Sequence, residues 1–307
     1  MAYVGILSPR PPAAVGTLSY VYLRRRAAAP DSTIPMLLKV LPERIAAKRF
    51  NVRRRPISAL LAGVGAGGPV LQDAGATALV IAGGYALVST FDNLTRRNII
   101  EQNLSRKLVH ILSGLLFLAS WPIFSTSTVA RYFASLVPSM NCLRLVIHGL
   151  SLVPDEGLIK SVTREGKPEE LLRGPLFYVL VLILCAIVFW RESPIGMVSL
   201  AMMCGGDGIA DIMGRRFGAL KIPYNQQKSW AGSISMFLFG FLVSISILYY
   251  FSAFGYIKLE GVWTLERVAL ISLVATVVES LPITETVDDN ISVPLASMMA
   301  AFLVFGH

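Results

Sequence analysis

Two aspartates, Asp207 and Asp211, stand four residues apart in a glycine-rich stretch that follows an apolar run. On a helix this spacing places both carboxylates on one face, where they repel each other unless a cation lies close by. Mg²⁺ prefers one or two carboxylates together with substrate phosphates as its ligands. We therefore predict that this pair binds Mg²⁺ beside a phosphate. Pairing of the same acids with Arg215 and Arg216 is the alternative.

The residues around this pair could bind an anion. Glycines remove side chains, so that backbone N–H groups can approach a phosphate. The glycines of the stretch are Gly205, Gly206 and Gly208. Further on, Lys228 and Ser229 precede another apolar run, and an ammonium and a hydroxyl at a helix N-terminus form an anion pocket. An interfacial anchor of Lys228 with Trp230 is the alternative.

Three more polar positions lie at or near the ends of apolar runs. His110 follows Arg106 and Lys107, a combination that can contact phosphate or transfer a proton. The alternative is that Arg106 and Lys107 are positive-inside anchors and that His110 forms a hydrogen bond within the bundle. Glu279 lies late in an apolar run, and a carboxylate within a membrane normally faces a site or a partner. Asp288 precedes the last run, where an acid also suits the positive end of a helix dipole.

The composition is that of a membrane protein. The 307 residues have a mean hydropathy of +0.62, and only 15% are charged, against roughly 25% in soluble domains. Continuous apolarity without a polar face predicts membrane-spanning helices, whereas a membrane barrel needs alternating segments. The runs are 70–91, 108–124, 129–150, 174–190, 194–206, 230–254, 265–283 and 291–306. We predict an all-α polytopic integral membrane helical bundle in the lipid bilayer, with seven or eight transmembrane helices because the fifth run is short.

The basic residues favour one orientation of such a bundle. With eight spans, the loops 92–107, 151–173, 207–229 and 284–290 share one face and carry twelve Lys and Arg, against four at the other face. This asymmetry follows the positive-inside rule. It also places most of the polar motifs on the same side.

The N-terminal segment accounts for the whole net charge of +9. Residues 1–70 contain eleven Lys and Arg but two acids, while 71–307 is neutral. An Arg-rich, acid-poor leader without an apolar core is typical of an organellar transit peptide. Nothing in it has the aromatic interleaving of a nucleic-acid-binding arm, so no nucleic-acid partner is expected. We assign 1–65 to a transit peptide and 66–307 to a single membrane domain.

Several enzyme classes lack their motifs in this chain. There is no P-loop, no protein-kinase motif set and no nucleophile elbow. The three cysteines, Cys142, Cys185 and Cys204, are widely separated in apolar runs and indicate neither a disulfide framework nor a zinc site.

The order of the motifs resembles that of the plant phytol kinases, members of the polyprenol kinase family, which also includes dolichol and farnesol kinases and is similar to the CDP-diacylglycerol synthases. The resemblance covers roughly 70–307. It rests on the segments 105–110, 161–166, 169–175, 205–218, 228–233, 279–282 and 288–290.

The resemblance implies transfer of the γ-phosphate of CTP, a nucleoside triphosphate, to phytol or a related isoprenoid alcohol. Phytyl phosphate would feed tocopherol synthesis, in a chloroplast membrane with the active face towards the stroma. Metal and nucleotide roles are implied for Asp207, Asp211, Arg215 and Lys228, and more weakly for the loop containing Arg164. Candidates for the base that accepts the hydroxyl proton are His110, Glu279 and Asp288.

Other activities compete with this interpretation. The alcohol could be farnesol or geranylgeraniol, because an apolar tunnel discriminates weakly between chains. A cytidylyltransferase would instead form a CDP-lipid. A transporter is disfavoured, because no internal repeat is visible and the polar motifs cluster on one face.

Overall fold

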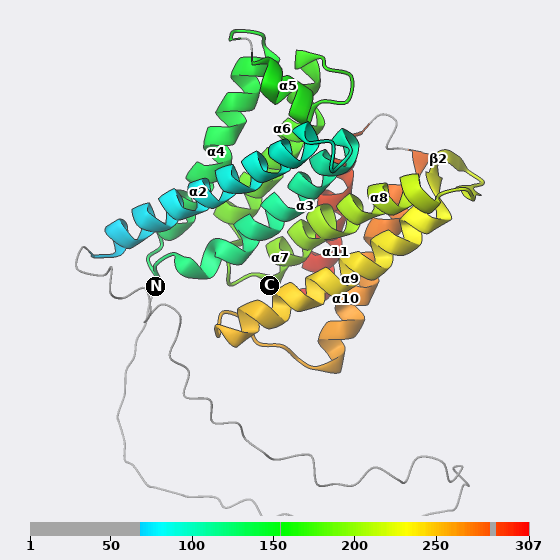
Figure 1. Cartoon of the computed structure of the whole chain (residues 1–307). Coiled ribbons are helices and arrows are strands. Elements are labelled where there is room, and N and C mark those ends of the chain that lie inside the picture. The colour runs from blue at the N-terminus through cyan, green and yellow to red at the C-terminus, as the bar shows by residue number, and fades with distance from the viewer. Residues whose placement is uncertain (1–67, 154, 283–286, 307) are drawn as a thin grey trace, which may run out of the picture. The chain divides into compact units, whose positions relative to one another are not determined.

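The computed structural model describes residues 68–153, 155–282 and 287–306 (Figure 1). The predicted transit peptide, residues 1–65, lies outside the described residues.

The described residues form helices joined by short loops, with one small hairpin. The α-helices are α2 (Gly68–Arg96), α3 (Gln102–Ser120), α4 (Ala130–Gly149), α5 (Glu156–Val162), α6 (Gly174–Leu184), α7 (Pro194–Ala201), α8 (Gly208–Phe217), α9 (Trp230–Ala253), α10 (Val262–Ser280) and α11 (Asp289–Phe305). Short 3₁₀ segments are η2 (Trp121–Ile123) and η3 (Pro168–Leu172), and wider π-helical turns are η4 (Cys185–Phe189) and η5 (Met202–Asp207). The hairpin pairs β1 (Lys221–Ile222) with β2 (Asn225–Ser229) in antiparallel register. The predicted all-α class is confirmed.

Each of the eight predicted runs overlaps a helix. Among the described residues, four helices are long and apolar enough to cross a membrane: Gly68–Arg96, Pro168–Phe189, Pro194–Phe217 and Trp230–Ala253. The helix Asp289–Phe305 is apolar but shorter. The protein is thus an all-α membrane protein, and its total of seven or eight spans stays a prediction.

One prediction needs correction, because the stretch 207–229 is not simply a loop. The fifth run continues through η5 into α8, so that Pro194–Phe217 is one unbroken helix, and the hairpin supplies the rest. A π-helical turn accommodates the glycines of this stretch within the helix.

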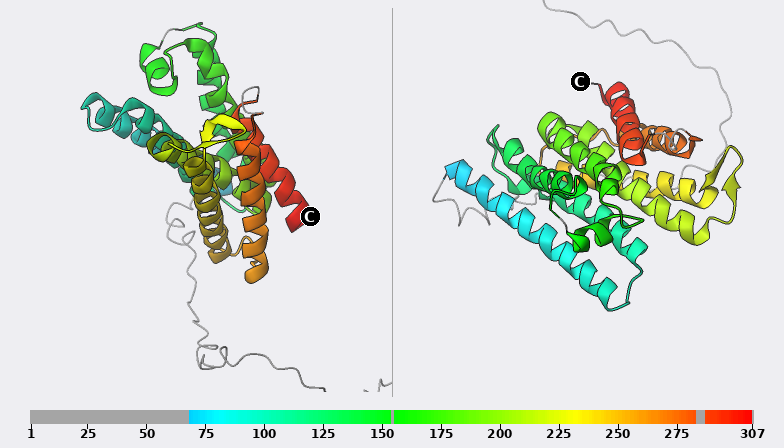
Figure 2. Two further views of the ribbon diagram at one scale, coloured as in Figure 1. Left: turned by 90° about the vertical axis from the view of Figure 1, so that its right-hand side faces the viewer. Right: turned by 90° about the horizontal axis from the view of Figure 1, so that it is seen from above.

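The helix Pro194–Phe217 is the interior helix of the bundle. Its apolar window is 83% buried, whereas that of α2 is only 17% buried, so the other helices surround it (Figure 2). A Cβ on Gly206 would lie 3.4 Å from the Cα of Gly240 in α9, so α9 approaches it closely. Small residues allow such close contact between membrane helices. The interior helix carries the aspartates into the bundle.

A buried arginine fixes the end of the bundle opposite to these aspartates. Arg191 is 2% exposed and donates to the carbonyls of Trp121, Phe124 and Ser125, at 3.2, 2.9 and 2.6 Å. Ser125 in turn donates from its N–H and hydroxyl to the buried carboxylate of Asp73, at 2.7 and 2.8 Å. These bonds join α2, the end of α3 and the segment before α7.

Replacing this arginine should destabilise the bundle. Arg191→Met leaves three buried carbonyls without donors, which costs roughly 2–4 kcal/mol. We expect a clearly lower melting temperature in detergent micelles. Arg216→Met, at an exposed position, should change stability by less than about 0.5 kcal/mol. Equal melting temperatures for the two variants would contradict this role for Arg191.

Candidate functional site

A cleft of about 2040 Å³ opens at the end of the bundle where the predicted face lies. Its lining includes residues from all four loops that the charge pattern groups together: Arg96, Arg164, Lys221 and Asp288 are examples. The predicted gathering of these loops at one end is therefore confirmed. The cleft also contains nine of the predicted site residues: His110, Arg164, Asp207, Asp211, Arg215, Lys228, Ser229, Glu279 and Asp288.

The first cluster of charges is centred on Lys107 of α3. Its ammonium lies 3.3 Å from a carboxylate oxygen of Asp207 and 3.9 Å from one of Asp211. Asp207 is 4% exposed, so its charge needs a partner. Arg215 donates to the other oxygen of Asp211 at 3.0 Å, one helical turn away. The two aspartates do share one face, as predicted, and the ammonium of Lys107 lies between them.

The second cluster is centred on Lys228. Its ammonium lies 2.5 Å from Glu279 at the end of α10 and 2.9 Å from Asp289 at the start of α11. Ser233 donates to the second oxygen of Glu279 at 3.4 Å. Lys228 also acts electrostatically on Asp207, which links the two clusters. Lys228 thus has carboxylate partners and is more than an interfacial anchor.

The hairpin positions Lys228. The side chain of Asn225 is buried and donates to the carbonyl of Ser280 at 3.1 Å, while its oxygen accepts from the N–H of Gln227. The hydroxyl groups of Tyr224 and Ser280 lie 2.8 Å apart. These bonds join the hairpin to the last turn of α10. Because Ser280 follows Glu279 directly, the same contact brings Lys228 to its partner.

The charge of Lys228 depends on its carboxylates. Burial lowers the pKa of this ammonium, but the charges of Asp289 and Glu279 outweigh burial and raise the pKa above its ordinary 10.5. A pKa raised by folding contributes stability that is fully present below the unfolded value and is lost as pH rises through the folded value.

Removing one counter-charge should therefore reduce the part of the stability that depends on alkaline pH. Glu279→Gln leaves Lys228 buried with one carboxylate fewer, so its pKa falls towards the unfolded value. The variant should be less stable than wild type at neutral pH, and it should lose less stability as pH rises above the unfolded pKa, so that the difference between the two narrows. Melting temperatures measured from neutral to about pH 11 test this. Glu260→Gln, which removes an acid from the exposed pair with Arg267, serves as control. The expectation is wrong if the melting temperature of Glu279→Gln changes with alkaline pH in the same way as those of the wild type and of Glu260→Gln.

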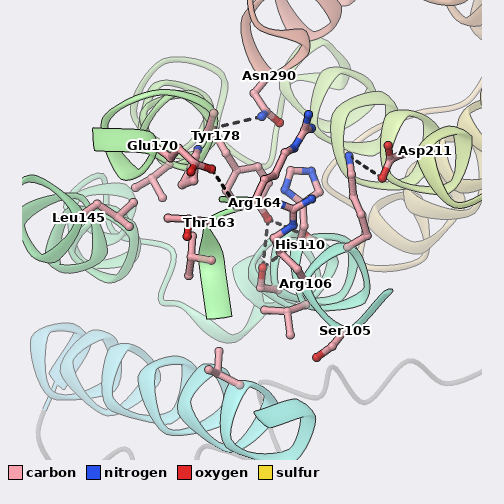
Figure 3. Close-up of a pocket in the computed structure, with 18 of the residues that line it drawn as sticks. Ser105, Arg106, His110, Leu145, Thr163, Arg164, Glu170, Tyr178, Asp211 and Asn290 are labelled. Carbon is pink, nitrogen blue, oxygen red and sulfur yellow. Dashed lines mark hydrogen bonds and ion pairs between the residues drawn. The ribbon is translucent and has the colours of Figure 1, made fainter. Parts of the chain in front are cut away.

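A third group of charges borders the cleft near the loop after α5. Glu170 accepts the backbone N–H groups of Arg164, Glu165 and Lys167, the first at 2.6 Å, and so holds this loop in place. Figure 3 shows Arg164 and Arg106 close together in the cleft. Arg106 interacts unfavourably with Arg164 and Arg215, and favourably with Asp211 and Glu170. Converging arginines favour an anionic ligand.

His110 lies deeper in the cleft, against an aromatic ring. Its ring centroid is 4.1 Å from that of Tyr178, whose hydroxyl donates to the carbonyl of His110 at 2.9 Å. The same hydroxyl lies 3.2 Å from that of Ser113. These contacts, visible in part in Figure 3, fix α3 against α6.

Two predicted binding residues also cap helices. The hydroxyl of Ser229 accepts the N–H of Gly232 at 3.2 Å and begins α9, and Asp288 accepts the N–H of Asn290 at 2.9 Å and begins α11. Both line the cleft, yet each has an atom engaged in capping. The helix-dipole alternative for Asp288 agrees with this position.

The three predicted glycines do not line the cleft. A Cβ on Gly205 would lie 2.9 Å from Val243, one on Gly206 would lie 3.3 Å from Met202, and one on Gly208 would clash with Ile111. All three are buried between helices. Their lack of side chains is explained by the close packing of α3 and α9 on the interior helix.

This packing role predicts a specific rescue. Gly208→Ala should lower stability and activity, because the added methyl meets Ile111, and Ile111→Ala in the same chain should restore much of both. Thermal unfolding and turnover of the single and double variants measure this coupling. A glycine needed for backbone contact with phosphate would show no rescue.

Some site residues were missed at the sequence level. From the sequence, Lys107 is only a basic neighbour of His110 and not a partner of Asp207, and Asp289 is not singled out. Lys107 could have been found, since a buried acid in an apolar helix requires a basic partner. No sequence signal pointed to Tyr178, because its role depends on where α6 lies.

These features define a class of protein, a helical membrane protein with a charged cleft at one end. Over 261 residues the chain is 65% identical to "Phytol kinase 1, chloroplastic" of Arabidopsis thaliana, covering 85% of this chain and 84% of that protein. It is 71% identical over 238 residues to "Probable phytol kinase 1, chloroplastic" of Glycine max, covering 78% and 79%. It is 43% identical over 279 residues to "Farnesol kinase, chloroplastic" of Arabidopsis thaliana, covering 89% and 90%. No family model and no solved structure matches the chain.

The chain therefore belongs to the polyprenol kinase family, among the plant phytol and farnesol kinases. These relatives are named chloroplastic. Together with the apolar helices, this indicates a chloroplast membrane protein.

Proposed function

We propose that this protein is a phytol kinase, which transfers the γ-phosphate of CTP to the hydroxyl of phytol and releases CDP. The relatives named for phytol and farnesol support an isoprenoid alcohol as the acceptor. The phytyl phosphate would serve tocopherol synthesis in the chloroplast. The charged loops would then face the stroma, where a soluble nucleotide can reach the cleft.

One observation carries the proposal, namely that a single cleft is charged at one part and apolar at another. We call the second part the apolar arm; it is lined by Val80, Gly84, Val88, Leu116, Val137 and Leu182. A nucleotide needs the charged part, and an isoprenoid chain needs the apolar arm. Because the two are continuous, both substrates can meet at their junction. On α3, Lys107 and His110 precede Leu116 of the apolar arm, so we place the junction beside them.

The aspartates are suited to hold Mg²⁺. Carboxylate oxygens of Asp207 and Asp211 lie within 3.3 and 3.9 Å of one ammonium, so both can reach a single cation position. Among the described residues no group of three or more protein ligands gathers around a metal position. Two carboxylates completed by substrate phosphates are what Mg²⁺ prefers. When bound, the ion would neutralise charge on the phosphates.

The cationic side chains would position and neutralise the phosphates. Phosphoryl transfer depends mainly on alignment of the reacting groups and on stabilisation of negative charge. Arg106, Arg164 and Arg215 line the cleft, and Arg106 interacts electrostatically with each of the other two. Lys107 and Lys228 lie inside it, each already held by carboxylates, so they require little reorganisation on binding.

His110 is our candidate for the group that accepts the hydroxyl proton. Glu279 is paired with Lys228, and Asp288 caps α11. The Nε2 atom of His110 is buried and has no hydrogen-bond partner within the described part of the chain. The imidazole lies where the charged part meets the apolar arm, which is where a hydroxyl would be presented.

Neutralising the buried aspartate should abolish transfer. Asp207→Asn removes a ligand charge and leaves Lys107 without its closest partner, so we expect a loss of at least about a hundredfold in CTP-dependent turnover. Asp211→Asn, at the more exposed acid, should lose less. The control is Glu260→Gln, which removes an acid of an ion pair outside the cleft and should keep wild-type activity. Full activity of Asp207→Asn in isolated membranes would refute the metal assignment.

Labelled CTP distinguishes this reaction from its competitors. With the label on the γ-phosphate, a kinase produces labelled phytyl phosphate and CDP. A cytidylyltransferase would instead transfer the CMP group and release pyrophosphate. The γ-label would then leave in the pyrophosphate, and only CTP labelled on the α-phosphate would label the lipid. The same membranes supplied with ATP or GTP test the donor.

A further inference from the structure

The apolar arm opens sideways between α2 and α4. Tyr85 and Met140 both line the cleft, yet they are 76% and 59% exposed, so the cleft reaches the outside of the bundle between them. Two turns before Tyr85 on α2, the hydroxyl of Thr77 donates to the carbonyl of Phe133 in α4 at 3.0 Å and joins the two helices. An opening beside apolar helices suits a ligand that arrives from the bilayer.

The depth of the arm can be measured along α3. A Cβ on Gly83 would lie 3.6 Å from Leu116, so this turn of α2 is level with Leu116. Leu116 is six residues beyond His110, which corresponds to roughly 9 Å along a helix. The neighbouring Gly84 therefore lies well inside the arm, away from the charged part of the cleft.

Gly84 leaves space at this depth. Val80, Gly84 and Val88 recur every fourth residue and line the arm from one side of α2. A Cβ on Gly84 would have no heavy atom within 4 Å, in contrast to the glycines of the interior helix. The missing side chain is thus not explained by helix packing, and it widens the arm between two valines.

We propose that the apolar arm holds the hydrocarbon chain of the alcohol and that Gly84 determines how long a chain it accepts. This inference rests on the proposed function, since it concerns the acceptor of the same reaction. A chain that enters between α2 and α4 would place its hydroxyl at His110 and extend past Gly84. A short alcohol would end before reaching Gly84.

A bulky residue at this position should therefore select against long chains. The assay measures kcat/KM of membranes containing Gly84→Phe with geraniol, farnesol, geranylgeraniol and phytol. We expect near wild-type values for geraniol and a relative loss of at least about tenfold for geranylgeraniol and phytol. Gly84→Ala and Gly84→Leu should give graded, smaller shifts in the same order, which separates a narrowed arm from misfolding.

Gly75 provides a matched control. It lies on the same helix, is exposed, does not line the cleft, and likewise has no heavy atom within 4 Å of an added Cβ. Gly75→Phe should leave the preference among the four alcohols within about twofold of wild type.

Two outcomes would overturn the inference while leaving the proposed function intact. One is an equal loss for all four alcohols across the Gly84 series, and the other is an unchanged order of preference with Gly84→Phe. If the wild-type protein phosphorylated none of these alcohols with any nucleotide, the proposed function itself would fail, and the inference with it.

Discussion

The ion pair between Lys107 and Asp207 is the interaction on which the site depends. Asp207 belongs to a helix that is almost entirely enclosed by others, and an unpaired carboxylate there would be very costly. Lys107 of α3 supplies the opposite charge at 3.3 Å. The pair therefore fixes α3 against the interior helix. Removing one partner of such a buried pair typically costs about 3–5 kcal/mol.

The interior helix in turn determines the arrangement of the rest. Its glycines allow α3 and α9 to approach closely, which brings the start of α9 and the hairpin towards Asp207. The hairpin binds the last turn of α10, so Lys228 reaches Glu279 there and Asp289 of α11. Four carboxylates and three cations from five segments thus form one network. Under the proposed function, these contacts would hold the side chains in place before phosphates and a cation bind.

The two ends of the bundle use buried charge differently. Around Arg191 the guanidinium donates to three backbone carbonyls and Ser125 donates to the carboxylate of Asp73, so that groups of the protein itself complete the arrangement. In the cleft, by contrast, Arg106 is repelled by both Arg164 and Arg215. Like charges held together in this way favour an anion. The end with Arg191 stabilises the fold, whereas the end with the cleft has cationic side chains with which an anionic ligand could pair.

The sequence by itself determined the helical membrane class, the gathering of four loops at one end, and most charged residues of the cleft, because apolar length and charge placement are local properties. The tertiary structure decided the partners. It showed that Lys107, not Arg216, neutralises Asp207, that Gly205, Gly206 and Gly208 serve helix packing, and that 207–217 continues a helix. These facts depend on contacts between residues as much as a hundred positions apart, which spacing along the chain does not specify.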